Sequence, residues 1–220
     1  MDYRCHHSAI MVHMASNRIE SIVFDLGNVL IPWNPRNLYK KLFPGDAAGM
    51  ERFLATICTQ EWNDTLDSDV TYAQGTAQLT AKFPGQQALI EAYDRRWEEM
   101  LGEPIAENVA LLSFLHRQGW PVYALSNWSQ EKFPIALSRF AFLSLFRGMV
   151  ISGEVGLRKP DPAIFRLLLE RYSLEPASTL FIDDTSKHCE TARSLGIQVI
   201  QYLNPGQLRN ELINMGVPVP

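Results

Sequence analysis

Short apolar runs alternate with helical patterns through the second half of this chain, and that alternation constrains the fold more than any other feature. The expected elements, in chain order, are a helix over 103–119, a strand over 122–125, a helix from 161, a strand over 179–182, a helix near 186–195 and a strand over 197–202. Strands that alternate with helices at this spacing predict an α/β fold with a doubly wound parallel, Rossmann-like sheet.

The pattern changes between residues 34 and 102, where no convincing strand is present. Breaks at Pro44-Gly45 and Pro84-Gly85, with a capping box from Thr71 to Gln74, divide this stretch into four expected helices. The second of them should cover 46–59 and the fourth about 86–100. A compact helical insert is therefore expected directly after the first strand.

These patterns divide the chain into three parts. The α/β core is expected at 21–33 and 103–220, and a helical cap at 34–102. Residues 1–20 match nothing downstream and lack the apolar stretch of a secretory signal, so we expect a disordered or peripheral extension there.

A carboxylate ends the first expected strand. Asp25 follows the apolar run Ile22-Val23-Phe24, and a turn containing Gly27 follows at once. In open α/β sheets ligands bind where strands end, so an acid at this position is placed for chemistry. It is ionised at neutral pH and could act as a nucleophile, whereas the simpler interpretation is that it only caps the turn.

Three later segments also place polar groups beside the ends of strands or helices. Ser126 and Asn127 follow a strand, Lys159 precedes a helix, and Asp183 and Asp184 follow another strand. Each has an ordinary alternative: turn chemistry, a surface cation, or helix capping by Asp184. If these strands are neighbours, three carboxylates converge and require a cation. Oxygen ligands in that number suit Mg²⁺.

Taken together, Asp25, Ser126, Lys159 and the Asp183-Asp184 pair resemble the four motifs of the haloacid dehalogenase-like (HAD) hydrolase superfamily, in its helical-cap subgroup. The resemblance implies Asp25 as nucleophile, Lys159 as the charge-neutralising cation, and Ser126 with Asn127 as phosphate ligands. It also implies a Mg²⁺ site made by Asp25, the Gly27 carbonyl and Asp184, with Asp183 close by or acting through water. The implied activity is hydrolysis of a small phosphate monoester through an aspartyl-phosphate.

Gly27 departs from that family pattern. Typical phosphatase members carry a second aspartate there, which protonates the leaving alcohol, and general acid help is worth about 10²–10⁴-fold in rate. Either a water, a cap residue or a good leaving group substitutes for the missing acid, or turnover is slow. A subset of the family shares Asp-Leu-Gly-Asn-Val and includes phosphatases of glucose 1-phosphate, whose leaving group is comparatively good. Sugar phosphates are therefore the favoured substrates.

Three alternatives compete with a phosphatase. A 2-haloacid dehalogenase of the same fold usually has an aromatic residue at the position of Gly27 and Ser-Ser-Asn in place of Asp183-Asp184, and this chain has neither. A non-catalytic phosphate-binding or interaction protein is supported only by Gly27, and the retained Asp25 and Lys159 argue against it. A phosphotransferase acting on sugar phosphates is also weakened by the missing acid.

Five residues beyond the first strand are candidates for contacting the substrate, namely Trp33, Arg36, Glu61, Trp62 and Asp64. For Trp62 a place in the cap core is favoured, and for Arg36 a surface charge. His188 could be an acid–base group, but we expect its ring to point away from the metal.

Composition narrows the remaining possibilities. The net charge of −4 and the absence of basic runs argue against a nucleic-acid or anionic-membrane surface. Three scattered cysteines without a paired motif fit reduced thiols in the cytoplasm. The expected partner is a small-molecule phosphate ester, and the expected assembly a monomer or homodimer.

Overall fold

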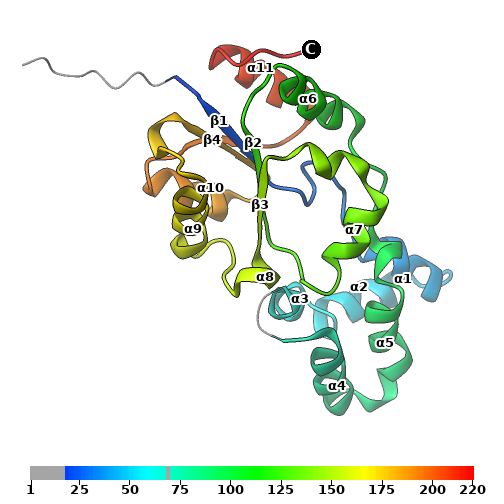
Figure 1. Cartoon of the computed structure of the whole chain (residues 1–220). Coiled ribbons are helices and arrows are strands. Elements are labelled where there is room, and N and C mark those ends of the chain that lie inside the picture. The colour runs from blue at the N-terminus through cyan, green and yellow to red at the C-terminus, as the bar shows by residue number, and fades with distance from the viewer. Residues whose placement is uncertain (1–17, 68–69) are drawn as a thin grey trace, which may run out of the picture.

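The computed structural model describes residues 18–67 and 70–220, and its centre is a five-stranded sheet (Figure 1). Every pairing is parallel, and the strand order is β3-β2-β1-β4-β5. The strands are β1 Ser21–Phe24, β2 Val122–Ser126, β3 Gly148–Ile151, β4 Thr179–Asp183 and β5 Gln198–Gln201. The predicted parallel α/β sheet is confirmed.

The register brings the carboxyl ends of the central strands together. Phe24 at the end of β1 pairs with Ala124 of β2 on one side and with Ile182 of β4 on the other. The chain runs outward from β1 to β3 and then crosses to β4 on the opposite side. Residues that follow β1 therefore lie at the point where the winding direction changes, which is where open α/β sheets bind ligands.

Alternate strand residues face opposite sides of the sheet, and each side has its own helices. On one side, Ile22 and Phe24 pack with α6 (Ala106–Arg117), α7 (Phe133–Arg139) and α11 (Pro205–Asn214). On the other, Val23 packs with α9 (Pro162–Tyr172) and α10 (Ser186–Ser194). Figure 1 shows these two groups on either side of the strands. Burying each such aliphatic side chain contributes about 1.5–3 kcal/mol, which holds the strand ends in fixed positions.

Between β1 and α6 the described residues form helices and no strand. They are α1 Arg36–Leu42, α2 Ala47–Thr56, α3 Gln60–Leu66, α4 Tyr72–Lys82 and α5 Gln87–Arg95, with 3₁₀ turns η1 Pro84–Gln86 and η2 Trp97–Met100. The predicted capping box is present at Thr71. Tyr39 is fully buried among the rings of Phe53 and Tyr93, and it anchors the group. Figure 1 shows α1–α5 gathered at one end of the molecule, beside α7 and the short α8 (Ser152–Val155).

The two segments that join these helices to the sheet run side by side. Trp33 and Leu101 form an antiparallel bridge. The Asn34 N–H donates to the Met100 oxygen at 2.9 Å, and the Gly102 N–H donates to the Pro32 oxygen at 2.7 Å. The chain therefore enters and leaves the helical segment through one paired connection.

Five helices and strands were not predicted from the sequence, namely β3, α3, α7, α8 and α11. Strand β3 begins with a glycine and has only four residues, so it carried too weak a strand signal. Helix α3 was missed because the sequence pattern predicts no helix between the one over 46–59 and the capping box at Thr71, whereas α2 ends at Thr56 and α3 starts at Gln60. The signal that could have found α3 is Thr59, whose side chain accepts from the Trp62 N–H at its start. The remaining 3₁₀ turns are η3 Ala141–Leu145 and η4 Pro176–Ser178.

The predicted N-terminal extension lies mostly outside the described residues. Where the description begins, Ile19 is 3% exposed within the core, and the Glu20 N–H donates to the Ser178 oxygen at 2.8 Å. The packed part of the chain thus starts slightly before the predicted boundary at residue 20. Within the described ranges, no helix has the length and apolar character needed to cross a bilayer.

Candidate active site

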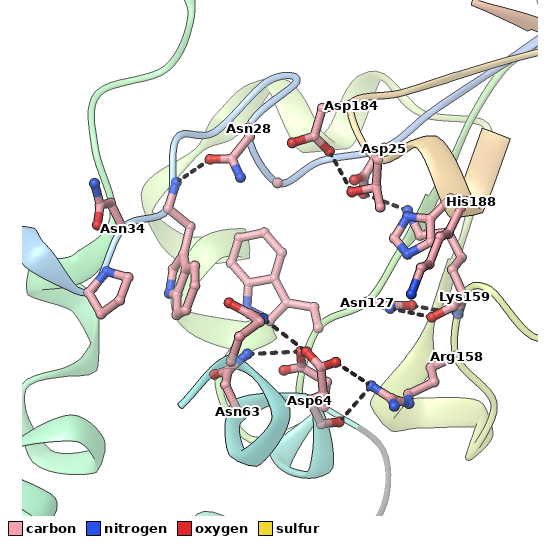
Figure 2. Close-up of a pocket in the computed structure, with 18 of the residues that line it drawn as sticks. Asp25, Asn28, Asn34, Asn63, Asp64, Asn127, Arg158, Lys159, Asp184 and His188 are labelled. Atoms are coloured by element: carbon pink, nitrogen blue, oxygen red, sulfur yellow. Dashed lines mark hydrogen bonds and ion pairs between the residues drawn. The ribbon is translucent and has the colours of Figure 1, made fainter. Parts of the chain in front are cut away.

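A cavity of about 800 Å³ opens where β1, β2 and β4 end, and α3 and η2 complete its wall. Figure 2 shows Asp25, Asp184, Lys159 and His188 together on one side, with Asn63 and Asp64 on another. Further lining residues are Gly27, Asn28, Trp33, Asn34, Pro35, Arg36, Gln60, Asp67, Trp97, Asn127, Trp128, Arg158, Pro160, Thr185 and Lys187.

Asp25 is held in the floor of this cavity with 7% of its surface exposed. Its N–H donates to the Ile182 oxygen of β4 at 2.8 Å, and its own Oδ1 accepts from the Leu26 N–H at 2.7 Å. Burial, and after it the charges of Asp183 and Asp184, raise the pKa of Asp25 to about 6, against the lowering effect of Lys159. Strand pairing therefore fixes the position of Asp25. Its carboxylate is protonated more easily than that of an ordinary aspartate until a further cation approaches.

Lys159 is the cation at the centre of the site, and its side chain is fully buried. Its Nζ lies 3.0 Å from Asp25 Oδ1 and 2.6 Å from Asp183 Oδ2. Burial would lower the pKa of Lys159, but the two carboxylates outweigh burial and raise it. A surface role for this lysine, the simpler expectation, is wrong.

Asp183 and Asp184 differ in how their oxygens are used. Asp183 is fully buried, and its oxygens accept from Lys159 and from the Thr185 N–H. Asp184 lines the cavity, and its Oδ1 accepts from Thr185 Oγ1 at 3.2 Å. Burial and the neighbouring Asp183 raise the pKa of Asp184. Helix capping by Asp184 is not observed, because Thr185 occupies the cap position of α10.

Three carboxylates converge as the sequence suggested. Ligand oxygens of Asp25, Asp183 and Asp184 lie within 4.8 Å of one another. The single ammonium of Lys159 compensates only part of this negative charge, so the cluster fits a divalent cation bound by oxygen ligands.

Asn127 and Ser126 lie at the end of β2 in different environments. The Asn127 amide clamps the Lys159 backbone, since Nδ2 donates to its oxygen at 2.9 Å and Oδ1 accepts from its N–H at 2.8 Å. The second Nδ2 hydrogen can still donate to a ligand. Ser126 is 1% exposed and is not one of the cavity-lining residues, whereas Asn127 is.

The turn after Asp25 is shaped by Asn28 rather than by Gly27. Asn28 adopts a left-handed conformation with φ of 56°, and its Oδ1 accepts from the Trp33 N–H at 3.1 Å. Gly27 has no left-handed φ, and a β-carbon added there would meet nothing within 4 Å. Neither backbone strain nor crowding therefore explains the glycine.

His188 does not behave as expected. Its ring lies against the acid pair, with Nδ1 3.0 Å from Asp183 Oδ1, and it lines the cavity. Burial tends to raise the pKa of Asp183, but Lys159 and His188 outweigh it and lower that pKa to about 2. Since Asp183 is then an acceptor only, Nδ1 of His188 must carry a hydrogen. The expectation that the ring points away was wrong because the first turn of α10 starts directly after the acids.

The helical side of the cavity is joined to the strand side by specific contacts. Arg158 Nη1 lies 3.0 Å from Asp64 Oδ2, and the Ser152 hydroxyl donates to the Asp67 oxygen at 2.8 Å. These contacts tie the C-terminal half of α3 and the residue after it to segments that follow β3.

The five candidates from beyond the first strand separate into two groups. Trp33, Arg36 and Asp64 line the cavity, whereas Glu61 and Trp62 do not. Trp62 packs edge-on against Tyr93 in the helical core, as favoured from the sequence. Arg36 pairs with Glu51 at 2.6 Å with nearly half its side chain exposed.

Sequence reasoning missed Trp128, which lines the cavity beside Asn127 and packs against Trp97. Its Nε1 is the one buried side-chain nitrogen or oxygen, among residues 18–67 and 70–220, without a hydrogen-bond partner. An unpaired buried N–H costs about 1–3 kcal/mol, so this donor is available to an acceptor in the cavity. The signal was its position directly after Ser126-Asn127.

The profile of the haloacid dehalogenase-like hydrolase family matches residues 19–196. This chain belongs to that family. As an HAD-like hydrolase it retains the parallel sheet, and all the candidate residues from Asp25 to Asp184 lie within the matched range.

Curated proteins similar to this HAD-like hydrolase fall into two sets. The chain spans only about a fifth of the length of some of them. One is drimenol cyclase drtB of Aspergillus calidoustus, which is 34% identical over 94 aligned residues. Those residues make up 43% of this chain and 18% of the relative. Others match over most of their length. Sesquiterpene phosphatase astK of Aspergillus oryzae is 28% identical over 81% of this chain and 87% of its own. D-ribitol-5-phosphate phosphatase of Bacteroides thetaiotaomicron is 25% identical, and the alignment covers 88% of this chain and 97% of the relative.

Solved structures agree with this family assignment. An HAD-family enzyme of Bacteroides thetaiotaomicron aligns with a TM-score of 0.69 and 25% identity, over 84% of this chain and 94% of that one. L-2-haloacid dehalogenase from Xanthobacter autotrophicus aligns with a TM-score of 0.60, over 91% of this chain and 84% of the dehalogenase. At 16% sequence identity, this likeness shows a shared fold alone.

Proposed function

We propose that this HAD-like hydrolase is a Mg²⁺-dependent phosphatase of small phosphate monoesters that works through an aspartyl-phosphate on Asp25. The observation that carries the proposal is the carboxylate cluster of Asp25, Asp183 and Asp184, with ligand oxygens within 4.8 Å and Lys159 bonded to two of the three. Such a cluster at the ends of parallel strands suits Mg²⁺, which typically shares its site with a substrate phosphate.

The residues present fit that ion. Asp25 and Asp184 would hold Mg²⁺ with the Gly27 carbonyl, and Asp183 would act through water because its oxygens already accept from Lys159 and Thr185. When bound, the ion would withdraw charge from the phosphoryl oxygens. It would also favour the ionised form of Asp25, whose pKa of about 6 reflects burial and neighbouring acids.

Each step of the proposed hydrolysis can be assigned to residues of this chain. An Asp25 oxygen attacks phosphorus in line, an acyl-phosphate bond forms, and the bond to the leaving oxygen breaks. The Lys159 ammonium neutralises charge on the transferring group, and the second Asn127 N–H holds one of its oxygens. For Ser126, which is buried at the end of β2 and does not line the cavity, phosphate binding stays a prediction from the sequence. Water then attacks phosphorus, releasing phosphate and restoring Asp25.

The rest of the cavity supports hydroxylated substrates, with sugar phosphates favoured. Three tryptophans line it with the side-chain amides of Asn28, Asn34, Gln60 and Asn63. Aromatic faces cover the C–H surface of a sugar, and amides pair with its hydroxyls. The unpaired Trp128 Nε1 adds one donor for a sugar oxygen. The ribitol-phosphate phosphatase among the relatives acts on a substrate of this class.

We also propose the division into core (21–33 and 103–220) and cap (34–102). The paired connection at Trp33 and Leu101 supports it, because a single two-stranded joint is what a moving cap requires. A cytoplasmic location is supported by Cys58 and Cys189, which are buried free thiols.

Dehalogenation is the competing chemistry. It needs no metal, and the crowded carboxylates would repel a substrate that is itself a carboxylate. The acid pair and Gly27 therefore favour phosphate transfer.

The test is phosphate release from p-nitrophenyl phosphate with and without Mg²⁺, followed by a panel containing sugar phosphates, ribitol 5-phosphate and a prenyl phosphate. We expect metal-dependent release, with the highest kcat/KM for a polyhydroxylated ester. Chloride release from 2-chloropropionate without metal would instead make the protein a dehalogenase. Inactivity in both assays would favour a binding role.

A further inference from the structure

Under the proposed function, the site still needs a source for the proton that a poor leaving group takes up. Gly27 supplies none, although the space beside it would accept a side chain. An alkoxide leaving without a proton is costly, and general acids are worth about 10²–10⁴-fold. A proton source elsewhere in the cavity wall is therefore expected.

We propose that Asp67, at the end of α3, is the general acid that protonates the leaving-group oxygen. Asp67 lines the same cavity as Asp25 but comes from the helical side, where the leaving group of a bound ester must lie. The proposal rests on the phosphatase function proposed above.

Asp67 is fixed by contacts to both sides of the cavity. Its backbone oxygen accepts from the Ser152 hydroxyl at 2.8 Å, and Ser152 is fully buried at the start of α8. Its Oδ2 accepts from Asn63 Nδ2 at 3.3 Å, and Asn63 Oδ1 accepts from the Tyr93 hydroxyl at 2.8 Å. A carboxyl held in this way is positioned for proton transfer rather than free to rotate into solvent.

The charged and titratable groups around Asp67 favour its neutral form. Arg158 pairs with Asp64 at 3.0 Å, and no ion pair to Asp67 is found among the described residues. Burial first, and then the charge of Asp64, raise the pKa of Asp67 well above its usual range, while Arg158 opposes them. The other titratable groups facing it, Tyr72 and Tyr93, have pKa values raised by burial and stay neutral. These surroundings favour the protonated form of Asp67.

The proton balance closes over one turnover. As Asp25 attacks, the electron pair of the breaking P–O bond moves to the leaving oxygen, which takes the Asp67 proton and departs as an alcohol. Asp67 is left as a carboxylate. It then accepts a proton from the water that hydrolyses the aspartyl-phosphate, and so returns to its acid form.

Other groups in the cavity serve this role less well. The Asp64 carboxylate is already engaged by Arg158 at 3.0 Å. The Nδ1 hydrogen of His188 is directed at Asp183. Asp67 is the cavity-lining carboxyl that is outside both the metal cluster and the Arg158 pair.

The test compares two aryl esters of the same shape, phenyl phosphate with a poor leaving group and p-nitrophenyl phosphate with a good one. Asp67→Asn keeps the size of the side chain but removes the proton. We expect kcat/KM to fall about 10²-fold or more for phenyl phosphate and less than about 10-fold for p-nitrophenyl phosphate. The fall in wild-type kcat/KM for phenyl phosphate at alkaline pH should disappear in the variant.

Asp64→Asn is the matched control, because it makes the same chemical change on the same helix. It should lower kcat/KM for both esters by a similar factor. If Asp67→Asn also lowers kcat/KM for both esters equally, and kcat/KM for phenyl phosphate still falls at alkaline pH, Asp67 is not the general acid. The phosphatase function then stands. If the wild-type protein with Mg²⁺ hydrolyses neither ester, it is the phosphatase proposal that has failed.

Should Asp67→Asn not fold, the wild-type enzyme alone decides. Across a series of substituted phenyl phosphates, protonation of the leaving oxygen predicts rates that depend weakly on leaving-group pKa. A steep dependence would overturn the assignment.

Discussion

The two sides of the cavity are built in different ways. On the strand side, Asp25, Lys159 and Asp183 are held by the register of β1 and β4 and by short ionic contacts of 3.0 and 2.6 Å, with almost no exposure. On the helical side, Gln60, Asn63, Asp64 and Asp67 come from the seven-residue helix α3 and its end. Few contacts, among them Arg158 to Asp64 and Ser152 to Asp67, join that helix to the other side.

This difference separates chemistry from selectivity. Groups fixed by a buried parallel sheet keep the geometry that phosphoryl transfer requires, and removing one leaves uncompensated charge in the interior. Groups on a short helix can move with the helices around them, which suits substrate selection and protonation of varied leaving groups. Changes on the strand side should therefore have large effects on activity and folding, and changes on the helical side smaller effects that depend on the substrate.

The largest effect is expected for Asp25→Asn. Loss of the nucleophile should lower kcat for p-nitrophenyl phosphate by about 10⁴-fold or more, because covalent catalysis has no substitute here. Asp46→Asn, at the start of α2, is the control, since asparagine caps a helix as well as aspartate does. Comparable activity in the two variants would contradict the nucleophile assignment.

Lys159→Met should have the largest effect on stability. It leaves Asp25 and Asp183 buried without their cation, so the free energy of unfolding should fall by about 3–5 kcal/mol in urea titrations. Lys41→Met, which removes an exposed pair with Glu99, should cost no more than about 1 kcal/mol. Equal losses would show that the central ion pairs do not stabilise the strand side.

Gly27→Asp tests the missing acid from the strand side. The space around Gly27 is open, so the variant should fold normally. Combined with Asp67→Asn, which removes the proposed acid, it should hydrolyse phenyl phosphate about 10-fold faster or more than Asp67→Asn alone, with a smaller gain for p-nitrophenyl phosphate. Gly27→Asn, which fills the same space without a proton, should show no such gain. Loss of all activity in both variants would mean that Gly27 is needed for backbone shape.

The smallest effect concerns Asp67 and pH. Its raised pKa means that folding favours the protonated form, so the contribution of Asp67 to wild-type stability is greatest below about pH 4 and is lost as the pH rises through the pKa of the folded state. Asp67→Asn cannot ionise and should lose this dependence, with its melting temperature overtaking that of the wild type at neutral pH. Parallel melting curves across pH would refute a buried neutral carboxyl.

The strand side was largely predictable from sequence, and the helical side was not. Apolar runs that end in Asp25, Ser126 and Asp183 predict the strands. They also predict where the polar groups lie, because the carboxyl ends of parallel strands meet at one edge of the sheet. The bidentate clamp of Asn127 on Lys159 could not be predicted, since it depends on how two distant loops meet.

For the helical side, the sequence pattern predicts helices but not which of their faces line the cavity. Trp62 and Asp64 are two residues apart on α3, yet only Asp64 lines the cavity. The role of Asp67 depends on Ser152, 85 positions away along the chain, and on burial that no local pattern records.

The central claim is that Asp25 carries the phosphoryl group during turnover. The most direct measurement is acid quenching of the enzyme with a radiolabelled phosphate ester and Mg²⁺, followed by counting protein-bound label. The account predicts label on the wild-type protein that hydroxylamine releases, and none on Asp25→Asn. Steady hydrolysis without any protein-bound label, and equally fast in Asp25→Asn, would contradict it.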